Sequence, residues 1–323
     1  MTKTIAIIAG EPNSISSEII FKSWKSRKKY VHKPFIVIGS FKLLNSQKKK
    51  LNYNIKLKKI NDNFKNKDLN QKSLPVYDVN YKQEKSFQKI STKSNKYIFK
   101  CFKEALKLIK YRKILGFINC PVSKETLFKK KHQGITEFLS KKSKVKNNEV
   151  MLIFNKNLAV APLTTHIPLY QVAKKISKIK IIEKVKVINN FYNKIFKKKP
   201  NIAILGLNPH KFSAAKIKEE SKIIIPAINI LKKDKIKVIG PVSPDTSFLL
   251  FKKYKFDVIF GMYHDQVLTP FKALFKYNAI NITLGLPYVR VSPDHGTAEN
   301  IMGKGIANPL SLIESIKFFN YIK

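Results

Sequence analysis

Residues 257–270 read DVIFGMYHDQVLTP, an apolar run that leads directly into a histidine and an aspartate. The run predicts a buried β-strand over Asp257–Phe260, so that His264 and Asp265 follow its carboxyl end. In open α/β sheets, ligands bind at the carboxyl ends of the strands. The stretch therefore favours an α/β protein in which His264 belongs to a functional site.

Apolar runs of strand length alternate with amphipathic stretches of helix length along most of the chain. The predicted strands are Ile5–Ala9, Phe35–Gly39, Ile114–Asn119, Val150–Phe154, Leu158–Pro162, Asn201–Leu205, Ile236–Ile239, Asp257–Phe260 and Ala279–Thr283. Helical patterns include Ser86–Tyr111, Leu169–Lys197, Ala214–Leu231 and Pro309–Ile322. This alternation indicates the α/β class with a mostly parallel sheet. The least regular segment is 42–85, where we expect surface strands and loops.

The chain of 323 residues carries a formal net charge of +44, as many nucleic-acid-binding proteins do. However, arginine occurs only at Arg27, Arg112 and Arg290, and the other basic residues are scattered lysines. Proteins that read nucleic acid generally use the planar fork of arginine. We therefore attribute the charge to an AT-rich coding sequence and expect no specific nucleic-acid partner. A polycationic nucleic-acid-binding protein is the alternative.

The sequence predicts a cytoplasmic protein without a membrane partner. No apolar run reaches the roughly 18 residues that a membrane span needs, and the first apolar stretch is too short for a signal peptide. Cys101 and Cys120 show neither metal spacing nor a disulfide framework. The first strand is followed by AGEPNSIS, at 9–16, instead of a G-x-G-x-x-G loop. A nucleotide cofactor would therefore not be bound in the Rossmann manner.

Three histidines follow predicted strands. His166 ends LAVAPLTTH, His210 ends NIAILGLNPH, and His264 follows DVIFGMY. If these strands are parallel neighbours, the histidines converge on one edge of the sheet. Three imidazoles with a fourth position left open form a common catalytic site for Zn²⁺ and similar ions.

Carboxylates near the histidines strengthen the metal hypothesis, because such groups orient the rings and raise their basicity. Asp245, in GPVSPDTSF, and Asp265 are the candidates. The alternative interpretation is that the histidines are ordinary polar loop residues, since no local motif such as H-E-x-x-H is present.

Five stretches of this sequence resemble one known family. They are TTHIPL at 164–169, GLNPH at 206–210, GPVSPDTSF at 240–248, YHDQVLTPFK at 263–272 and NITLGLPYVRVSPDHGTA at 281–298. Weaker matches are GEP at 10–12, CPVSK at 120–124 and GITEFL at 134–139. They keep the family's order and span nearly the whole chain. The sequence resembles the 4-hydroxythreonine-4-phosphate dehydrogenase family, PdxA.

The resemblance implies a fold like that of isocitrate and isopropylmalate dehydrogenases, with two α/β domains and an active site in the cleft between them. Residues 1–130 plus 275–323 would form the domain on the cofactor side. Residues 131–274 would form the domain that carries the metal ligands and the dimer interface. The family is homodimeric, with active sites completed across the subunit interface. Its fold binds the nicotinamide cofactor with a different loop, which explains the missing Rossmann motif.

The resemblance also implies roles for individual residues. The metal ligands, counted as catalytic, are His166, His210 and His264. The substrate contacts are Thr136, Lys272, Asn281 and Arg290, of which Lys272 is also counted as catalytic. The residues expected to face the cofactor are Asp294, His295, Gly296 and Thr297. Asp245 and Asp265 would form the polar surroundings of the metal ligands.

The implied reaction is the NAD(P)-dependent oxidation of 4-phosphooxy-L-threonine to 2-amino-3-oxo-4-phosphooxybutanoate, in pyridoxal 5'-phosphate biosynthesis. The product, a β-keto acid, decarboxylates to 3-amino-2-oxopropyl phosphate. A divalent ion (Zn, Mg or Co) on the substrate hydroxyl would lower its pKa and favour hydride transfer. The substrate anions need cations, and Arg290 offers a fork that suits them.

Some of these residues also have simpler interpretations. Arg290 could form a surface ion pair, Lys272 could be solvated, and Asn281 could be a satisfied amide at a sheet edge. The segment 294–297 could be a tight turn before a helix.

The sequence departs from the family at three places near the expected substrate. The first loop, GEPNSISSE, has Ser14 and Ser16 where the family has glycines, and we expect a reshaped entrance. Ile135 replaces a substrate-binding histidine, and residues 211–215 lack the usual glycines. A dehydrogenase acting on a four-carbon sugar-acid phosphate, threonate or erythronate 4-phosphate, is therefore the alternative, and a weakened enzyme is a third possibility.

Overall fold

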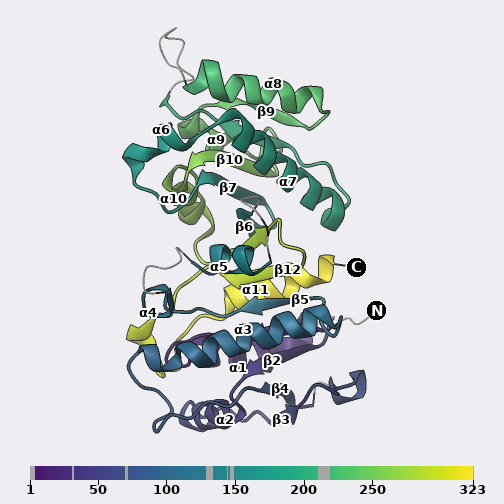
Figure 1. The fold of residues 1–323 in the computed structure, drawn as a ribbon, viewed down its shortest axis with the longest axis vertical. Helices are drawn as coiled ribbons and strands as arrows, with labels where there is room; N and C mark the ends of the chain where they lie inside the picture. The colour runs from purple at the N-terminus through teal and green to yellow at the C-terminus, as the bar shows by residue number, and fades with distance from the viewer. Residues whose placement is uncertain are drawn as a thin grey trace. The chain divides into compact units, whose positions relative to one another are not determined.

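The computed structural model describes residues 4–30, 33–69, 72–128, 134–143, 145, 149–209 and 219–322. The chain divides into two compact units, unit 1 with residues 1–135 and 288–323 and unit 2 with residues 136–287. Both contain a sheet with helices beside it (Figure 1). The predicted α/β class with mostly parallel strand pairing is confirmed.

The strands of unit 1 lie in the order β3-β4-β2-β1-β5-β12, and all their described pairings are parallel. Their bounds are β1 Ile5–Ile8, β2 Phe35–Gly39, β3 Leu57–Ile60, β4 Leu74–Asp78, β5 Gly116–Asn119 and β12 Val289–Pro293. The helices are α1 Ser16–Ser26, α2 Phe41–Lys50, α3 Asn95–Lys110, α4 Lys124–Phe128 and α11 Leu310–Phe318. Strands β1 and β2 are buried throughout, as expected for parallel strands covered on both faces.

The strands of unit 2 lie in the order β11-β6-β7-β10-β8-β9. Their bounds are β6 Val150–Asn155, β7 Leu158–Thr164, β8 Ile202–Leu205, β9 Val238–Val242, β10 Val258–Tyr263 and β11 Ile280–Leu284. Strand β6 pairs antiparallel with both β7 and β11, and the other described pairings are parallel. The helices are α5 Ile135–Lys142, α6 Val172–Lys175, α7 Lys178–Phe196, α8 Ile225–Lys233, α9 Pro244–Leu250 and α10 His264–Phe275.

One apolar cluster in unit 2 fixes the helix that begins at His264. Val267 and Phe271, on the inner face of α10, are fully buried against Phe248 and Ile259. Burying a phenylalanine side chain of this kind contributes about 2–3 kcal/mol. The apolar core therefore anchors the helix that begins at His264.

Two predicted helices are shorter than their apolar patterns. The prediction for 86–111 is wrong at its start, because α3 begins at Asn95 after a 3₁₀ turn at Thr92–Ser94. The backbone N–H groups of Gln88 and Ile90 donate to side chains of Asn13 and Glu299 instead of to a helix. The prediction for 169–197 contains an interruption, because Ile176 is extended and Ser177 caps α7.

The other differences concern the ends of elements and elements that were not predicted. Residues 214–218 of the predicted helix 214–231 lie outside the described residues, and α8 follows a π-helical segment at Glu220–Ile224. Helix α11 ends at Phe318 and continues as a 3₁₀ turn, Phe319–Tyr321. The irregular segment contains α2, β3 and β4, and strand β12 was not predicted.

Candidate functional site

His264 lies where the sequence predicts it, at the junction between a strand and a helix. Strand β10 ends at Tyr263, which is extended, and His264 is the first residue of α10. Its Nδ1 lies 2.7 Å from Oδ1 of Asp265. A carboxylate on Nδ1 keeps the proton there and leaves the lone pair of Nε2 for another partner.

His166 follows the neighbouring strand. Thr164 at the end of β7 is in register with Tyr263 at the end of β10, and His166 comes two residues later. The two imidazole centroids are 6.0 Å apart, with 40° between the ring planes. His166 Nδ1 also lies 3.9 Å from Oε1 of Glu137. The structure therefore brings two of the three predicted metal ligands together, each beside a carboxylate.

The spacing of these rings suits one shared cation. For a tetrahedral ion with metal–nitrogen bonds of about 2.1 Å, the centroids of two imidazole ligands lie about 5–5.5 Å apart. The observed 6.0 Å is about half an ångström longer than that spacing, so a small movement of the rings would let them share an ion. Both side chains are also accessible, with 38% exposure at His166 and 33% at His264. The described residues alone contain no group of three His, Cys, Asp or Glu side chains that could hold a metal.

The third predicted ligand, His210, lies outside the described residues, but the segment before it is held close to α10. Gln266, in the first turn of that helix, donates its Nε2–H to the carbonyl of Gly206 at 2.7 Å. Strand β8, which leads into Gly206, is the parallel neighbour of β10. The described chain therefore approaches His210 from beside the helix that carries His264.

Glu220 is a positioning residue that sequence reasoning missed. Its Oε1 accepts from the backbone N–H groups of Leu207 and Asn208, both at 2.9 Å. Its Oε2 accepts from the Asn208 side-chain amide at 3.0 Å. The side chain is only 2% exposed. One buried carboxylate thus fixes the segment that leads to His210, and the sequence offered no more than an acidic pair after that loop.

Two predicted substrate residues of unit 2 lie near each other through strand β11. The Oγ1 atoms of Thr136 and Thr283 are 3.4 Å apart. Asn281 precedes Thr283 by two residues, so the two side chains share one face of the strand. The Oδ1 of Asn281 is buried and has no hydrogen-bond partner within the described structure. A donor from a water molecule or a ligand would satisfy this oxygen.

Lys272 and Asp245 lie on helices of unit 2. Lys272 comes eight residues after His264 on α10 and is half-buried. Asp245 lies in the first turn of α9 and accepts a hydrogen bond of 2.7 Å from Ser243 Oγ.

Arg290 of unit 1 is buried, with 4% exposure, and is the second residue of β12. Its Nε donates to Oδ1 of Asn119, at the carboxyl end of β5, at 2.7 Å. An exposed surface ion pair, the simpler interpretation of Arg290, is therefore wrong. Asn119 is a second contact that sequence reasoning missed, because 171 residues separate the partners.

The predicted cofactor segment follows β12 directly. The Asp294 N–H donates to Ser311 Oγ at 2.9 Å, and the Thr297 carbonyl accepts from the Ile15 N–H at 3.2 Å. His295 Nδ1 lies 3.1 Å from the carbonyl of Gly296. A Cβ added to Gly296 would meet no protein atom within 4 Å, so this position is open.

The chain matches the family described as "Pyridoxal phosphate biosynthetic protein PdxA" over residues 31–319. The chain belongs to the PdxA family. A 4-hydroxythreonine-4-phosphate dehydrogenase of Sulfurihydrogenibium sp. (strain YO3AOP1) is 39% identical, covering 99% of this chain and 98% of the relative. A relative from Oceanobacillus iheyensis, provisionally named a D-threonate 4-phosphate dehydrogenase, is 32% identical and covers 97% and 95%.

A solved structure supports the same family assignment. The 4-hydroxythreonine-4-phosphate dehydrogenase of Klebsiella pneumoniae matches with a TM-score of 0.86 at 29% identity. The match covers 100% of this chain and 98% of that one. The likeness therefore extends over the whole PdxA fold rather than over one unit.

The first loop shows how this PdxA member does without two glycines. Ser14 Oγ donates to the Glu11 carbonyl at 2.7 Å and accepts from the Ser16 N–H at 3.1 Å. Neither serine has a positive φ, whereas Gly10 does, with φ of 72°. A Cβ at Gly10 would lie 2.5 Å from the Pro121 carbonyl oxygen. The loop thus needs glycine only at Gly10, and the serines add hydrogen bonds.

Two further features bear on the environment of the site. Burial raises the pKa of the Glu11 carboxyl, while hydrogen bonds from Asn13 N and Ser94 Oγ oppose that rise. Ile135, the substitute for the family histidine, is 5% exposed at the start of α5. Its apolar side chain is accommodated by burial.

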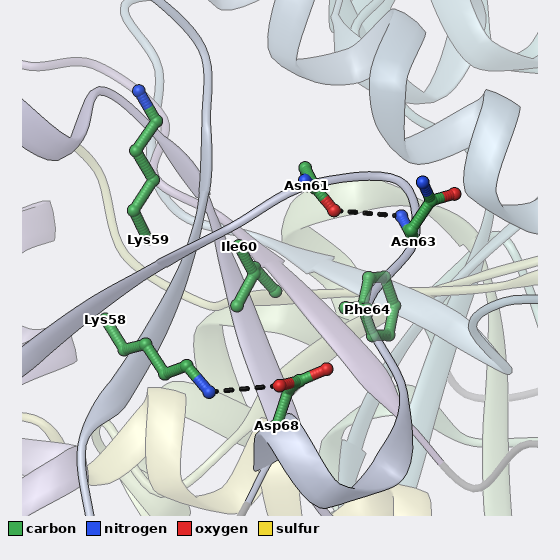
Figure 2. Close-up of a pocket in the computed structure, with 7 residues that line it drawn as sticks. All are labelled: Lys58, Lys59, Ile60, Asn61, Asn63, Phe64 and Asp68. Atoms are coloured by element: carbon green, nitrogen blue, oxygen red, sulfur yellow. Dashed lines mark hydrogen bonds and ion pairs between the residues drawn. The ribbon is translucent and has the colours of Figure 1, made fainter.

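A cavity of about 410 Å³ lies in unit 1, and none of the residues that line it is a predicted site residue (Figure 2). Its lining includes Lys58 and Asp68, which form an ion pair of 3.0 Å, and Asn61, whose Oδ1 accepts from the Asn63 N–H at 3.1 Å. These contacts pair polar groups of the lining with each other.

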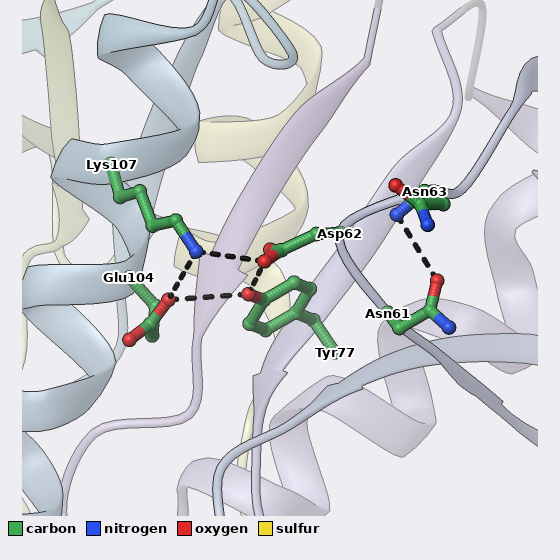
Figure 3. A network of polar contacts seen from close by, with 6 residues as sticks. All are labelled: Asn61, Asp62, Asn63, Tyr77, Glu104 and Lys107. Carbon is green, nitrogen blue, oxygen red and sulfur yellow. Dashed lines mark hydrogen bonds and ion pairs between the residues drawn. The ribbon is translucent and has the colours of Figure 1, made fainter.

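Beside this cavity, a polar network ties the segment after β3 to α3 (Figure 3). Asp62 accepts hydrogen bonds from Tyr77 and, at 2.7 Å, from Lys107. Tyr77 also donates to Glu104 at 3.2 Å. Hydrogen bonds from Lys107 and Tyr77 lower the pKa of Asp62. The network joins strand β4 and helix α3 and has no predicted catalytic role.

Among the described helices, none combines the length and the apolar character that crossing a membrane requires.

Proposed function

We propose that this PdxA-family protein is an NAD(P)- and divalent-metal-dependent dehydrogenase that oxidises 4-phosphooxy-L-threonine to 2-amino-3-oxo-4-phosphooxybutanoate. The product then loses carbon dioxide to give 3-amino-2-oxopropyl phosphate, in pyridoxal 5'-phosphate biosynthesis. The observation that carries the proposal is the pair of imidazoles at neighbouring strand ends, 6.0 Å apart and each beside a carboxylate. The name of the most similar relative reported above supports the substrate.

The assignment of the metal follows from the donor set. His166, His264 and His210 would hold the ion, and Asp265 would fix the orientation of the His264 ring. When bound, a divalent ion supplies Lewis acidity to the substrate hydroxyl. The protein's own contribution is to hold both rings on the ends of packed strands, so that little ordering is needed when the ion binds. Zinc, magnesium and cobalt all fit this role, and imidazole ligands favour the transition metals.

The substrate's anionic and polar groups are assigned to side chains with complementary charge. Arg290 supplies a buried guanidinium, and Lys272 a second cation that would also assist proton movement at the reacting end. Thr136 and Asn281 supply a hydroxyl and an amide along β11. Arginine suits an oxyanion best because its N–H groups form a planar fork.

The nicotinamide cofactor is assigned to the segment of Asp294, His295, Gly296 and Thr297. The open position at Gly296 leaves room for a ligand to approach the backbone. The carbonyl of Thr297 is tied to the first loop, so the two segments support each other. NAD and NADP both remain in the proposal.

We also propose a cytoplasmic homodimer with shared active sites. Of the twelve large hydrophobic side chains that are exposed in the described structure, nine belong to unit 2. Leu169 and Tyr170, 69% and 77% exposed, follow His166 within four residues. Apolar surface of this kind beside a metal ligand fits burial against a second copy.

The decisive experiment measures nicotinamide reduction by purified protein with 4-phosphooxy-L-threonine and each of zinc, magnesium, cobalt and manganese. Activity with at least one metal is expected, and His264→Ala should abolish both activity and bound metal by elemental analysis. His32→Ala is the control, because His32 lies in a lysine-rich stretch apart from the motifs. Lack of turnover with every metal would refute the proposal.

A second candidate is a D-threonate or erythronate 4-phosphate dehydrogenase. Ile135, in place of the family histidine, and the relative from Oceanobacillus iheyensis favour it. The same assay with both substrates separates the candidates by the ratio of their kcat/KM values. A higher value for the sugar-acid phosphate would replace the first assignment.

A further inference from the structure

The buried guanidinium of Arg290 is held from one side by an amide. The Nε–H of Arg290 donates to Oδ1 of Asn119 at 2.7 Å, and both side chains are buried, at 4% and 3% exposure. A neutral amide accepts this hydrogen bond without cancelling the positive charge of the arginine. The contact therefore orients the cation and preserves its charge.

The sheet register explains how the contact arises. Arg290 of β12 is paired with Phe117 of the parallel strand β5, and Asn119 lies two residues further along β5. Residues two apart share a face of a strand, so Asn119 lies diagonally ahead of Arg290. Because Asn119 ends β5, the contact draws the guanidinium toward the carboxyl ends of the strands, where ligands of such sheets bind.

The amide itself is held in one orientation. Asn119 Nδ2 donates to the carbonyl of Cys120 at 3.2 Å, which turns Oδ1 toward the arginine. Amide orientations are assigned from such networks, and here both hydrogen bonds agree. A guanidinium can grip an oxyanion through Nε and one Nη, or through its two Nη atoms. With Nε bound to Asn119, a paired grip must use the two Nη atoms.

We propose that Asn119 is a positioning residue that makes Arg290 present its terminal edge to the anionic group of the substrate. This inference rests on the proposed function for the identity of the substrate. The presence of an oriented anion site at Arg290 is testable without any dehydrogenase activity.

The test compares wild type with Asn119→Ala and Asn119→Asp. Asn119→Ala should raise KM for 4-phosphooxy-L-threonine about tenfold while kcat changes less than about threefold, because the lost contact orients a binding group. Asn119→Asp keeps the acceptor but adds a negative charge, so KM should rise at least as much while Tm stays near the wild-type value. Inorganic phosphate should raise the Tm of wild type, and both variants should reduce that shift.

A double-mutant cycle shows whether the effect passes through Arg290. In an Arg290→Lys background no Nε remains to be oriented, so Asn119→Ala should change KM less than about twofold. An equal effect in both backgrounds, or an unchanged KM and phosphate shift in both Asn119 variants, would overturn the inference. If wild type lacks dehydrogenase activity but its phosphate shift depends on Asn119, the proposed function fails and the anion site stands.

Discussion

Replacing Glu220 by alanine should destabilise unit 2 and weaken the segment that leads to His210. The substitution removes the acceptor for the backbone N–H groups of Leu207 and Asn208 and for the Asn208 side chain. A hydrogen bond to a charged group contributes about 1.5–3 kcal/mol. Leu207 and Asn208 are half-buried, so water replaces part of this loss, and we expect a total cost of about 3 kcal/mol.

The assay is thermal unfolding followed by circular dichroism. For a unit of roughly 150 residues, about 3 kcal/mol corresponds to a fall in Tm of about 6–12 °C. Glu220→Gln keeps one acceptor oxygen and should cost about 1 kcal/mol. Titration with cobalt should show an affinity for Glu220→Ala about tenfold below wild type, as for other residues that support metal ligands.

The neighbouring acid provides a matched control. Glu219 is half-buried, and its carboxylate has no hydrogen bond or ion pair within the described ranges. Glu219→Ala should therefore change the free energy of unfolding by less than about 0.5 kcal/mol. If the two alanine variants lower Tm equally, the reasoning that assigns the loop geometry to Glu220 is refuted.

Burial raises the pKa of Glu11 in the folded protein. The contribution of Glu11 to the free energy of unfolding is therefore fully present below its ordinary, unfolded-state pKa and is lost as the pH rises through its folded-state pKa. Glu11→Gln should thus gain stability relative to wild type between pH 4 and 7 in urea titrations, and a constant difference would contradict this. Hydrogen bonds from Lys107 and Tyr77 lower the pKa of Asp62 in the folded protein. The contribution of Asp62 to the free energy of unfolding is therefore present above its ordinary, unfolded-state pKa and is lost as the pH falls through its folded-state pKa. In Asp62→Asn, the free energy of unfolding should fall less than in wild type as the pH is lowered. An equal fall in both proteins would argue against the network. Ser14→Gly should cost about 1 kcal/mol in chemical unfolding, because it adds backbone freedom and removes the hydrogen bonds of the Ser14 hydroxyl with the Glu11 carbonyl, the Ser16 hydroxyl and the Ser16 N–H. An unchanged free energy of unfolding would show that these hydrogen bonds do not stabilise the loop.

Most strands could be predicted because parallel strands are buried on both faces and read as continuous apolar runs. Strand β12 was not predicted, because Arg290 interrupts its apolar pattern. Arg290, which interrupts the apolar pattern of the strand, is also the residue proposed to bind an anionic group. The false start of the helix predicted at 86–111 has a similar origin, because its first N–H groups are satisfied by side chains from other segments.

The candidate site also contains features that the sequence predicts and contacts that it does not. The proximity of His166 and His264 follows from strand ends alone, because neighbouring parallel strands deliver their next residues to one edge. The contacts of Glu220, Asn119 and Thr283 did not follow from the sequence. Each depends on a partner brought close by the fold, 13, 171 and 147 residues away respectively. Periodicity reports which face a residue occupies but not which side chain it meets there.

The three arginines show what composition can indicate in a lysine-rich chain. Arg27 stacks over Trp24 at 4.0 Å and donates to its carbonyl at 2.7 Å, and Arg290 is buried on Asn119. Both contacts use the flat, multiply donating guanidinium, which an ammonium does not reproduce. Arg112 is exposed at φ of 53°, and the structure gives no reason for arginine there. At two of the three positions, therefore, arginine is found where its geometry is used. Burial distinguishes these two, because Arg27 is half-buried in a stack on Trp24 whereas Arg290 is 4% exposed within a strand.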